Sequence, residues 1–594
     1  TMADINCDGW LDIYVCRTGK FRSENRANLL FINQKDGTFQ EAGAIYGLND
    51  PSFSNQAIFF DYDKDGDLDC YLVNHPVDFK NANNVALKYD GPDLVKSWPE
   101  DLTFFTDRLY RNEGDRFVNV SPAAGIQNYA YGLSATLLDV NQDGWLDIYV
   151  ANDYIEPDYL YVNNGDGTFT ESLADYVRKV SHNSMGSDVA DYNNDGQEDI
   201  IVLDMLPEDN YRQKLLANVM KYDRYTTQLK YGFYHQQMRN MLQLNNGNGS
   251  FSEVGQLAGV SHTDWSWGPL LADFDLDGWK DLYIANGYRR DITNLDYMNY
   301  TLDSLNKAGG VAALNDIYDL LDRVPETPIE NYMYRNARDL TFEKVTTAWG
   351  LDQTSFSNGA SFADLDADGD LDLIVNNVNE PAFLYLNQAV ERGGHFLTVK
   401  LDGTGKNTDA VGALATLVTE EGKQVQRLGP TRGYMSSVEP ILHFGMGGAT
   451  EGDLTIVWPD GQVSRETVQA NQHLTLQQSE ATEKTGGAAP SPEGFWQAAA
   501  NTGIDFTHQE NDDFIDFKRE PLLPHEFSHW GPAMAKSDIN GDGREDIWIG
   551  GAKDQAGAVY LQQVDGRFLA TTQPALQADA NHEDADGTWL DANG

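Results

Sequence analysis

The sequence predicts an all-β protein: a calcium-loop β-propeller, seven-bladed with its first blade missing, then a small β domain and the start of a second propeller. Three observations predict this fold. An acidic nine-residue motif occurs seven times, a run of aliphatic and aromatic residues follows each copy, and Asp-Gly or Asn-Gly turns recur after these runs. The chain of 594 residues is too long for one ordinary core, and it contains no apolar run of about 18 residues that could span a membrane.

The recurring motif reads Asp-x-(Asp/Asn)-x-Asp-Gly-x-x-Asp. Side chains at motif positions 1, 3 and 5 converge on one point when the backbone wraps around it. Gly at position 6 allows the sharp turn, and position 7 offers its backbone carbonyl. Asp at position 9 adds a carboxylate, directly or through water. Hard oxygen ligands in a flexible cage suit calcium and not a transition metal. A turn without an ion is disfavoured, because carboxylates packed this closely would repel one another.

We therefore predict one calcium ion per loop, about seven in all, held by positions 1, 3, 5, 7 and 9. In the first four loops these positions are Asp4, Asn6, Asp8, Trp10, Asp12; Asp61, Asp63, Asp65, Asp67, Asp69; Asp139, Asn141, Asp143, Trp145, Asp147; and Asp191, Asn193, Asp195, Gln197, Asp199. In the last three they are Asp273, Asp275, Asp277, Trp279, Asp281; Asp364, Asp366, Asp368, Asp370, Asp372; and Asp538, Asn540, Asp542, Arg544, Asp546. No residue is predicted to be catalytic or to bind another cofactor.

The residues around each loop predict strands. An EF-hand begins in the same way but requires Glu at position 12 and flanking helices. Position 12 is aliphatic in every copy, within runs such as LDIYV that are typical of strands. A small-residue strand such as SATLLDV precedes the loop, and a hairpin such as YLYVNNGDGTF follows it. Four strands in roughly 50 residues are typical of one propeller blade.

Charge and cysteine content exclude several classes of function. The chain carries 92 acidic and 42 basic side chains, for a net charge of −50. Nucleic acid is excluded as a partner because it requires a basic surface, and direct binding to anionic lipid is disfavoured for the same reason. Cys7, Cys16 and Cys70 are too few for a disulfide framework or a structural zinc site, and we expect small buried side chains.

Loop spacing predicts how the chain is divided. Residues 1–390 are expected to form an N-terminally incomplete propeller, with insertions near 75–107, 206–240 and 289–328. The second and third insertions have helical periodicity, and such insertions either carry binding surfaces or merely decorate the rim. Residues 391–479 predict a small β domain, 480–494 a low-complexity linker, and 495–594 the start of a second, C-terminally incomplete propeller.

The repeated units resemble FG-GAP/VCBS repeats, the calcium-loop blades of integrin α-subunit propellers. Residues 393–478, which include RGYMSSVEPILHFGMG and LTIVWPDG, resemble the ASPIC/UnbV domain. Repeats followed by this domain resemble the cartilage acidic protein family and its bacterial surface relatives. The resemblance implies an extracellular or surface-exposed, calcium-stabilised propeller and implies no defined activity.

One enzyme motif is present but lacks its context. Residues 525–529 read H-E-F-S-H and match the zincin pattern H-E-x-x-H, which requires a sustained helix. Pro521 and Pro524 precede the stretch and Gly531-Pro532 follow it, so a lead-in to a strand is the better interpretation.

Five tryptophans could serve either packing or contact with a partner. Trp10, Trp145 and Trp279 stand at loop position 7 and are expected to pack between blades more than to face a partner. Trp265 and Trp267 fit a sugar-stacking platform and burial under the helical insertion equally well.

These features together favour a non-enzymatic binding or scaffold module for a protein or glycan partner, within a larger extracellular or outer-membrane assembly. Loops without Glu at position 12 should bind calcium at about 0.1–1 mM, which suits an exported protein on a bacterial outer surface. Its export signal is expected outside this chain. The alternative is a carbohydrate-active lyase or hydrolase on the propeller face, since a catalytic carboxylate pair cannot be singled out among 92 acidic residues.

Overall fold

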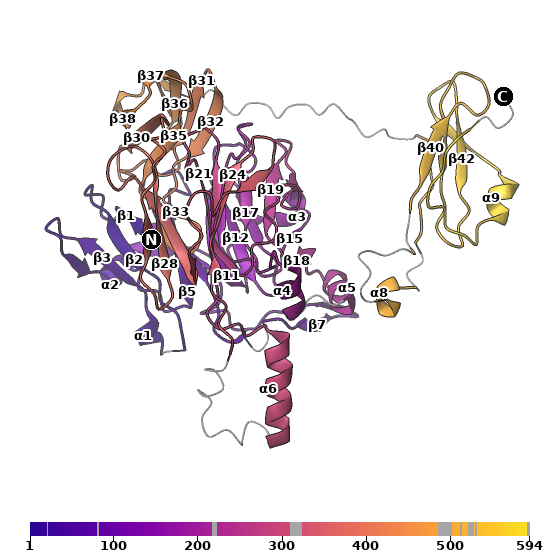
Figure 1. Cartoon of the computed structure of the whole chain (residues 1–594), viewed down its shortest axis with the longest axis horizontal. Helices are drawn as coiled ribbons and strands as arrows, with labels where there is room; N and C mark the ends of the chain where they lie inside the picture. The colour runs from indigo at the N-terminus through magenta and orange to yellow at the C-terminus, as the bar shows by residue number, and fades with distance from the viewer. Residues whose placement is uncertain are drawn as a thin grey trace. The chain divides into compact units, whose positions relative to one another are not determined.

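The computed structural model describes the whole chain except residues 21, 80–81, 217–221, 309–323, 485–501, 511–513, 521–527, 529–530 and 591–594. The chain divides into two compact units, Thr1–Ser491 and Pro492–Gly594, which are described separately (Figure 1). Among the described residues, no helix combines the length and hydropathy that a membrane-spanning segment needs.

Six repeat sheets, numbered in chain order, make up most of the first unit. Sheet 1 contains β1 (Met2–Ala3), β2 (Asp12–Val15), β3 (Leu29–Asn33) and β4 (Phe39–Glu41). Sheet 2 contains β5 (Ser54–Phe60), β6 (Asp69–Asn74), β9 (Arg108–Asn112) and β10 (Phe117–Asn119). Sheet 3 contains β11 (Tyr131–Leu138), β12 (Asp147–Asp153), β13 (Tyr159–Asn163) and β14 (Phe169–Glu171).

The next three sheets follow the same order. Sheet 4 contains β16 (Ser187–Ala190), β17 (Asp199–Val202), β19 (Met241–Asn245) and β20 (Phe251–Glu253). Sheet 5 contains β21 (Ser266–Ala272), β22 (Asp281–Asn286), β24 (Tyr332–Asn336) and β25 (Phe342–Lys344). Sheet 6 contains β27 (Ser357–Ala363), β28 (Asp372–Asn377) and β29 (Phe383–Tyr385).

Each repeat sheet is antiparallel, and its acidic loop joins the first strand to the second. Neighbouring sheets pack through their first strands: β5 contacts β11, β11 contacts β16, β16 contacts β21, and β21 contacts β27. Apolar side chains from facing sheets form continuous cores, because alternate residues of a strand point to opposite faces. The predicted all-β, propeller-like fold is confirmed, whereas the number of blades stays a prediction.

Residues 396–484 form two facing sheets, which we call the β30–β39 region. One sheet contains β35 (Ile441–Gly445), β30 (Phe396–Asp402) and β38 (Gln472–Gln477). The other contains β32 (Gly422–Arg427), β31 (Leu414–Thr419), β36 (Glu451–Val457), β37 (Gln462–Gln469) and β39 (Glu483–Lys484). A 3-10 turn, η3 (Gln478–Glu480), precedes β39. Because β39 pairs with β37, the start of the predicted linker 480–494 belongs to this sheet, and residues 485–494 lie outside the described residues.

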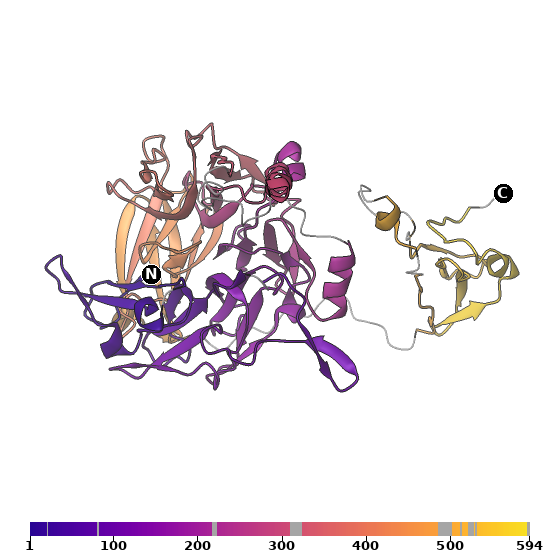
Figure 2. The same cartoon turned by 90° about the horizontal axis from the view of Figure 1, so that it is seen from below.

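A short hairpin of this region lies among the repeat sheets (Figures 1 and 2). This central hairpin consists of β33 (Thr431–Arg432), β34 (Ser436–Ser437) and the turn between them. Arg432 pairs with Asp188 of β16, and Gly433 bridges to Ser187. Further contacts reach the other sheets, from Thr431 to Thr1, from Tyr434 to Leu133, from Arg432 to Leu271 and from Ser437 to Ser361.

The three predicted insertions contain regular structure in their described parts. The first carries a hairpin, β7 (Leu87–Asp90) with β8 (Asp93–Lys96). The second carries α4 (Asn210–Leu215) and α5 (Tyr222–Lys230), and the third carries α6 (Leu295–Ala308), as the helical periodicity predicts. The remaining short elements are α1 (Ser23–Arg26), α2 (Gly43–Tyr46), α3 (Leu173–Tyr176), β15 (Val180–Ser181) with β18 (Gln236–Gln237), and β23 (Ile329–Glu330) with β26 (Thr354–Ser355).

Trp265 and Trp267 pack beside the central hairpin. Trp265 stacks on Tyr288 with ring centroids 4.1 Å apart, and Trp267 lies 4.9 Å from the ring of Tyr434. Both indoles are half-buried and belong to the apolar cluster around Tyr434.

The second unit repeats the four-stranded plan. Its sheet contains β40 (Met534–Ser537), β41 (Asp546–Ile549), β42 (Ala558–Gln562) and β43 (Phe568–Thr571), and the seventh acidic loop joins β40 to β41. Two short helices, α8 (Asp516–Arg519) and α9 (Pro574–Ala578), accompany it. Of the H-E-F-S-H stretch, all residues but Ser528 lie outside the described residues.

Candidate metal centres

Each acidic loop is a closed turn that its first carboxylate holds in place. In the loop of sheet 3, Asp139 accepts the backbone N–H groups of Asp143 at 3.1 Å and Gly144 at 2.9 Å. Gln142 at position 4 and Gly144 both adopt left-handed backbone conformations, with φ of 58° and 86°. Five other loops repeat both hydrogen bonds, those starting at Asp4, Asp191, Asp273, Asp364 and Asp538. The chain itself therefore forms the cage.

The carboxylate at position 9 ties each loop to the third strand of its sheet. Asp147 accepts the N–H of Val140 at 2.8 Å and that of Asn163, the last residue of β13, at 2.7 Å. Asn163 also donates its side-chain N–H to the carbonyl of Tyr62 in the preceding sheet, at 2.9 Å. The equivalent pairs are Asp12–Asn33, Asp69–Asn112, Asp199–Asn245, Asp281–Asn336, Asp372–Asn387 and Asp546–Gln562. Position 9 thus has a structural role that sequence reasoning missed.

Positions 1, 3 and 9 bring carboxylates together in three loops. Their oxygens lie within 4.8 Å of one another in the sets Asp61–Asp63–Asp69, Asp273–Asp275–Asp281 and Asp364–Asp366–Asp372. Among the described residues, Oδ1 of Asp61, Oδ1 of Asp63 and Oδ1 of Asp275 are buried without a hydrogen-bond partner. Unpaired buried carboxylate oxygens fit a hard cation such as calcium, which would satisfy them. These three loops are the ones that carry Asp at position 3 among the first six, where the other three carry Asn.

A hydrogen bond joins positions 5 and 7 within each loop. The position-5 carboxylate accepts the backbone N–H of position 7 in every copy, as Asp143 does from Trp145 at 2.8 Å. The side chain at position 7 is buried where it is aspartate, at Asp67 and Asp370, and more exposed where it is tryptophan. Trp10 is 49% exposed, and Trp145 lies under the ammonium of Lys64, 4.2 Å from its ring centroid. The prediction that these indoles pack between blades is therefore wrong for Trp10.

Burial raises the pKa of the clustered carboxylates. Loss of solvation is the main cause for Asp61 and Asp69, whose pKa values rise to about 7 and about 9, and neighbouring carboxylates add to it. The same cause raises the pKa of Asp147 and of Asp273 to about 7. Full ionisation of such a cluster requires a compensating positive charge, so the loops favour either protons or a bound cation.

The β30–β39 region contacts acidic loops of the first unit. The hydroxyl of Thr408 donates to Asp4 at 2.7 Å, and the ammonium of Lys406 lies 2.6 Å from Asp67, which stands at position 7 of the second loop. His443 approaches the carbonyl of Gly369 in the sixth loop with its Nε2 at 2.9 Å. The first, second and sixth loops therefore lie at an interface within the first unit.

Three loops carry charged residues at position 8, Glu198, Lys280 and Glu545, where the other four carry leucine. Glu198 of the fourth loop accepts two hydrogen bonds of 2.8 Å from the guanidinium of Arg427. Both side chains are largely buried, and a bidentate pair of this kind fixes orientation as well as distance. The leucines at the same position are Leu11, Leu68, Leu146 and Leu371.

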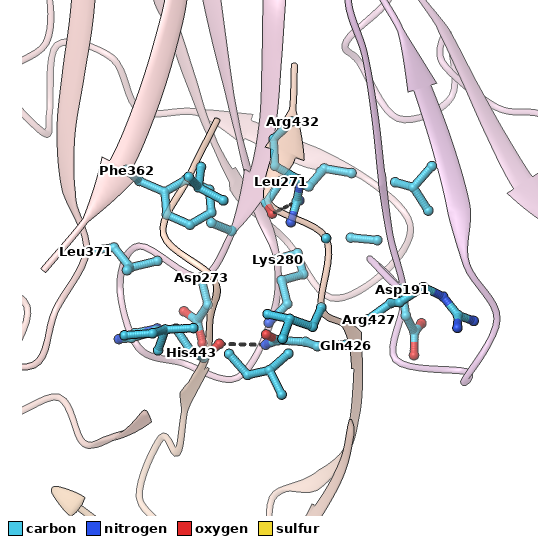
Figure 3. Close-up of a pocket in the computed structure, with 18 of the residues that line it drawn as sticks. Asp191, Leu271, Asp273, Lys280, Phe362, Leu371, Gln426, Arg427, Arg432 and His443 are labelled. Carbon is cyan, nitrogen blue, oxygen red and sulfur yellow. Dashed lines mark hydrogen bonds between the residues drawn. The ribbon is translucent and has the colours of Figure 1, made fainter. Parts of the chain in front are cut away.

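Lys280 occupies position 8 of the fifth loop and points into a cavity of about 50 Å³ (Figure 3). It is 4% exposed, and its ammonium has no hydrogen-bond partner among the described residues. Burial lowers the pKa of Lys280, while the charges of Asp273 and Asp191 act in the opposite direction. His443 also lines the cavity, and burial lowers its pKa to about 4.

These features define a class: all-β repeat proteins whose acidic, cation-fitting loops lie beneath a covering β region. A family model described as FG-GAP-like repeat matches residues 4–72, 139–202, 233–284 and 322–375, and a model described as ASPIC and UnbV matches residues 403–483. The chain thus carries FG-GAP-like repeats followed by an ASPIC and UnbV domain, and the predicted resemblance is confirmed.

Its curated relatives share low sequence identity. Cartilage acidic protein 1 of Homo sapiens is 24% identical over 442 residues, covering 73% of this chain and 55% of the relative. The Xenopus tropicalis protein of the same name is 23% identical over 361 residues, covering 59% of this chain and 45% of the relative. The chain thus spans about half the length of the curated relatives it matches.

Solved structures give weaker similarities. An Agrocybe aegerita lectin, described for its recognition of non-reducing terminal N-acetylglucosamine, gives a TM-score of 0.31 at 17% identity, covering 66% of this chain and 80% of the lectin. A rhamnogalacturonan lyase of Bacillus licheniformis gives 0.26 at 12% identity, covering 65% of this chain and 71% of the lyase. At these scores neither structure bears on the function of this chain.

Proposed function

We propose that this chain is an extracellular, calcium-stabilised binding or scaffold module without enzymatic activity, acting on a protein or glycan partner. The observation that supports this most directly is the set of carboxylate clusters at positions 1, 3 and 9, with their unpaired buried oxygens. Calcium meets the demand of such clusters for an oxygen-bound cation. Asn at position 3 supplies a carbonyl oxygen in the other loops, so we extend the proposal to all seven loops.

Each ion would act on stability and not as a reaction centre. The acidic loops recur once per sheet, and their ends are joined to strands by position 9, so no loop is singled out as a reaction site. An ion with a dissociation constant near 0.1 mM adds roughly 1.4 kcal/mol at 1 mM calcium. Six such sites in the first unit could contribute roughly 8 kcal/mol, which is comparable with the whole stability of a typical domain.

The proposed extracellular location follows from the expected affinity of the loops for calcium. Loops of this type without Glu at position 12 are expected to bind at about 0.1–1 mM, and only extracellular calcium fills such sites. Seven ions would also reduce the net charge from −50 to −36, since each adds two positive charges. An exported protein, displayed outside a cell, would be exposed to enough calcium to fill these loops.

Calcium-dependent melting tests the proposal. Purified chain is equilibrated in 1 mM calcium or in a chelator, and the melting temperature and the calcium content after desalting are measured. We expect a steep loss of melting temperature on chelation and up to about seven ions per chain. An unchanged melting curve, combined with loss of a measured turnover on a polysaccharide, would refute the structural role and favour a carbohydrate-active enzyme.

A further inference from the structure

A pocket of about 470 Å³ lies at the end of sheet 3 opposite its acidic loop. Tyr131 begins β11 and Glu156 follows the end of β12, whereas the acidic loop joins the other ends of these two strands. Residues of the first insertion, together with Phe233 of the second, complete the pocket wall. In Figure 1, β7 of the first insertion lies at the opposite end of the repeat sheets from the β30–β39 region. The pocket is therefore separate from the candidate metal centres.

Hydrogen bonds hold the first insertion against its neighbours. The hydroxyl of Tyr131 donates to the carbonyl of Asp78 at 2.9 Å. Arg224 of α5 donates to the carbonyl of Asn83 at 2.8 Å and to its side-chain oxygen at 3.0 Å. The first insertion is thus bound both to sheet 3 and to the second insertion, so the pocket is formed before any ligand arrives.

Aromatic side chains provide most of the apolar wall. Trp98 is 37% exposed, and Tyr129 is half-buried. The ring of Tyr129 packs against Phe105 with centroids 5.7 Å apart and against Tyr131 at 6.2 Å, which fixes its orientation. An exposed indole beside fixed rings offers a large flat surface on which a ligand can stack.

One ion pair supplies the charge of the pocket. The Glu156 carboxylate is 5% exposed and accepts hydrogen bonds from the ammonium of Lys96 and, at 2.6 Å, from the hydroxyl of Tyr159. Both bonds are made to Oε1, and the structure shows none to Oε2 from the described residues. Lys96 and Glu156 are the charged residues among those that line the pocket, so its lining carries no net charge.

The position of Lys96 disfavours a charged ligand. Its ammonium lies 5.0 Å from the ring centroid of Phe233 and 5.7 Å from that of Trp98, so it already occupies the place where aromatic rings would hold a ligand cation. An anionic ligand would meet the Glu156 carboxylate, which already neutralises Lys96, and a chain of net charge −50. A neutral ligand fits this pocket best.

We infer that this pocket binds a neutral sugar ring of a glycan, with the ring stacked on Trp98 and its hydroxyls hydrogen-bonded to Glu156 and Lys96. A sugar ring has C–H groups on its face and hydroxyls, which both donate and accept, at its edge. The pocket has the same division, with aromatic rings beside a carboxylate that accepts and an ammonium that donates. A purely apolar ligand would remove water from the ion pair without replacing its hydrogen bonds. Pockets of this size, with mostly apolar walls and a few polar groups, are typical of small-ligand sites.

This inference rests on the proposed function and specifies a glycan as the partner. No acidic-loop residue is among the described residues that line the pocket. Glycan binding should therefore persist wherever the first unit is folded, with or without calcium.

The test applies the full chain, carrying a terminal affinity tag, to an array of neutral and acidic oligosaccharides. We expect binding to neutral glycans, and titration calorimetry with the strongest of them gives the affinity. Trp98→Ala should weaken binding at least about tenfold because it removes the stacking surface, whereas Trp98→Phe keeps an aromatic ring and should stay within about threefold. Tyr89→Ala is the control and should bind within about twofold, since Tyr89 is 75% exposed on β7 and does not line the pocket. Equal melting temperatures establish that the variants fold.

Three results would overturn the inference: no binding to any neutral glycan, equal binding by Trp98→Ala and the original chain, or stronger binding of acidic than of neutral glycans. A chain that holds calcium in elemental analysis and binds no glycan would count against this inference alone. Glycan binding by a chain that holds no calcium would support this inference and count against the calcium part of the proposed function, so the two can fail separately.

Discussion

Arg432 of the central hairpin and Asp188 of β16 form a buried ion pair, with Nη2 and Oδ2 2.8 Å apart. Asp188 is fully buried and also accepts the backbone N–H of Leu271 at 2.8 Å. Arg432 donates to the carbonyl of Leu271 at 3.0 Å. These bonds join the hairpin to the first strands of sheets 4 and 5, so the β30–β39 region is attached at the centre of the repeat sheets as well as over their loops.

Removing one partner of this ion pair should lower the free energy of unfolding substantially. Arg432→Met leaves the Asp188 carboxylate buried without its counter-charge, and we expect a loss of about 3–5 kcal/mol in the free energy of unfolding. Thermal or denaturant unfolding of the full chain measures the loss. The double variant Asp188→Asn/Arg432→Met is the control, because it removes both charges. It should recover much of the stability, and a double variant no better than the single one would contradict the ion-pair explanation.

The loops allow a matched test of ion binding. Asp61→Ala removes the position-1 carboxylate that accepts the N–H of Gly66 and lies in the cluster with Asp63 and Asp69. It should remove one calcium ion per chain and lower the melting temperature by about 1–2 °C at 1 mM calcium. Elemental analysis and differential scanning calorimetry measure both effects.

Asp63→Asn is the control for that variant. Asparagine already stands at position 3 in other loops, so this change should keep the ion and weaken its binding only slightly. If Asp63→Asn lost the ion as completely as Asp61→Ala, the predicted equivalence of Asp and Asn at position 3 would be wrong.

The loops could be predicted from the sequence because their chemistry needs fixed residue types at fixed spacing. Asp139, Asn141, Asp143, Gly144 and Asp147 lie within one turn, and the structure folds them into one. The strands could be predicted for a similar reason, since aliphatic runs between turn residues have a local pattern. The second role of position 9 left no such pattern, because its partner Asn163 lies 16 residues away.

The central hairpin could not be predicted from local pattern. Its contacts join residues far apart in the chain, 244 positions in the case of Arg432 and Asp188, and nothing in the stretch RGYMSS marks it as a segment that lies among the repeat sheets. The contacts between the β30–β39 region and the acidic loops could not be predicted for the same reason. Thr408 and Lys406 are ordinary polar residues until the fold places them beside Asp4 and Asp67. The three-stranded form of sheet 6 did have a signal, since no hairpin turn follows Asn387.

Calcium stabilisation should increase with pH. Burial raises the pKa of Asp61 and of Asp273 to about 7 from an ordinary value of 3.8, so in the calcium-free protein these groups hold protons that the unfolded chain has released. The calcium-free fold should therefore lose stability as the pH rises from about 4 to about 8. Calcium binds only the ionised carboxylates and offsets their repulsion. Melting curves at pH 5, 6.5 and 8 should show a growing difference between calcium and chelator, and a constant difference would contradict the raised pKa values.

Replacing Lys280 with an apolar residue should stabilise the calcium-loaded protein. Its buried ammonium has no hydrogen-bond partner among the described residues, and the loaded fifth loop would place a divalent cation on the same carboxylate, Asp273, that the ammonium faces. Lys280→Leu introduces the residue that four other loops carry at position 8. It should raise the free energy of unfolding by about 1–3 kcal/mol in 1 mM calcium, because it removes an unsatisfied buried charge.

The change in stability caused by Lys280→Leu should depend on whether calcium is bound. Without calcium the ammonium partly offsets the negative charge of Asp273 and Asp191, so Lys280→Leu should then give a smaller gain or a loss. Lys88→Leu is the control, since this exposed lysine lies on the β7–β8 hairpin and its change removes the same charge. It should alter neither melting curve by more than about 0.5 kcal/mol. A Lys280→Leu variant that was destabilised equally with and without calcium would contradict the prediction that the buried ammonium is unsatisfied.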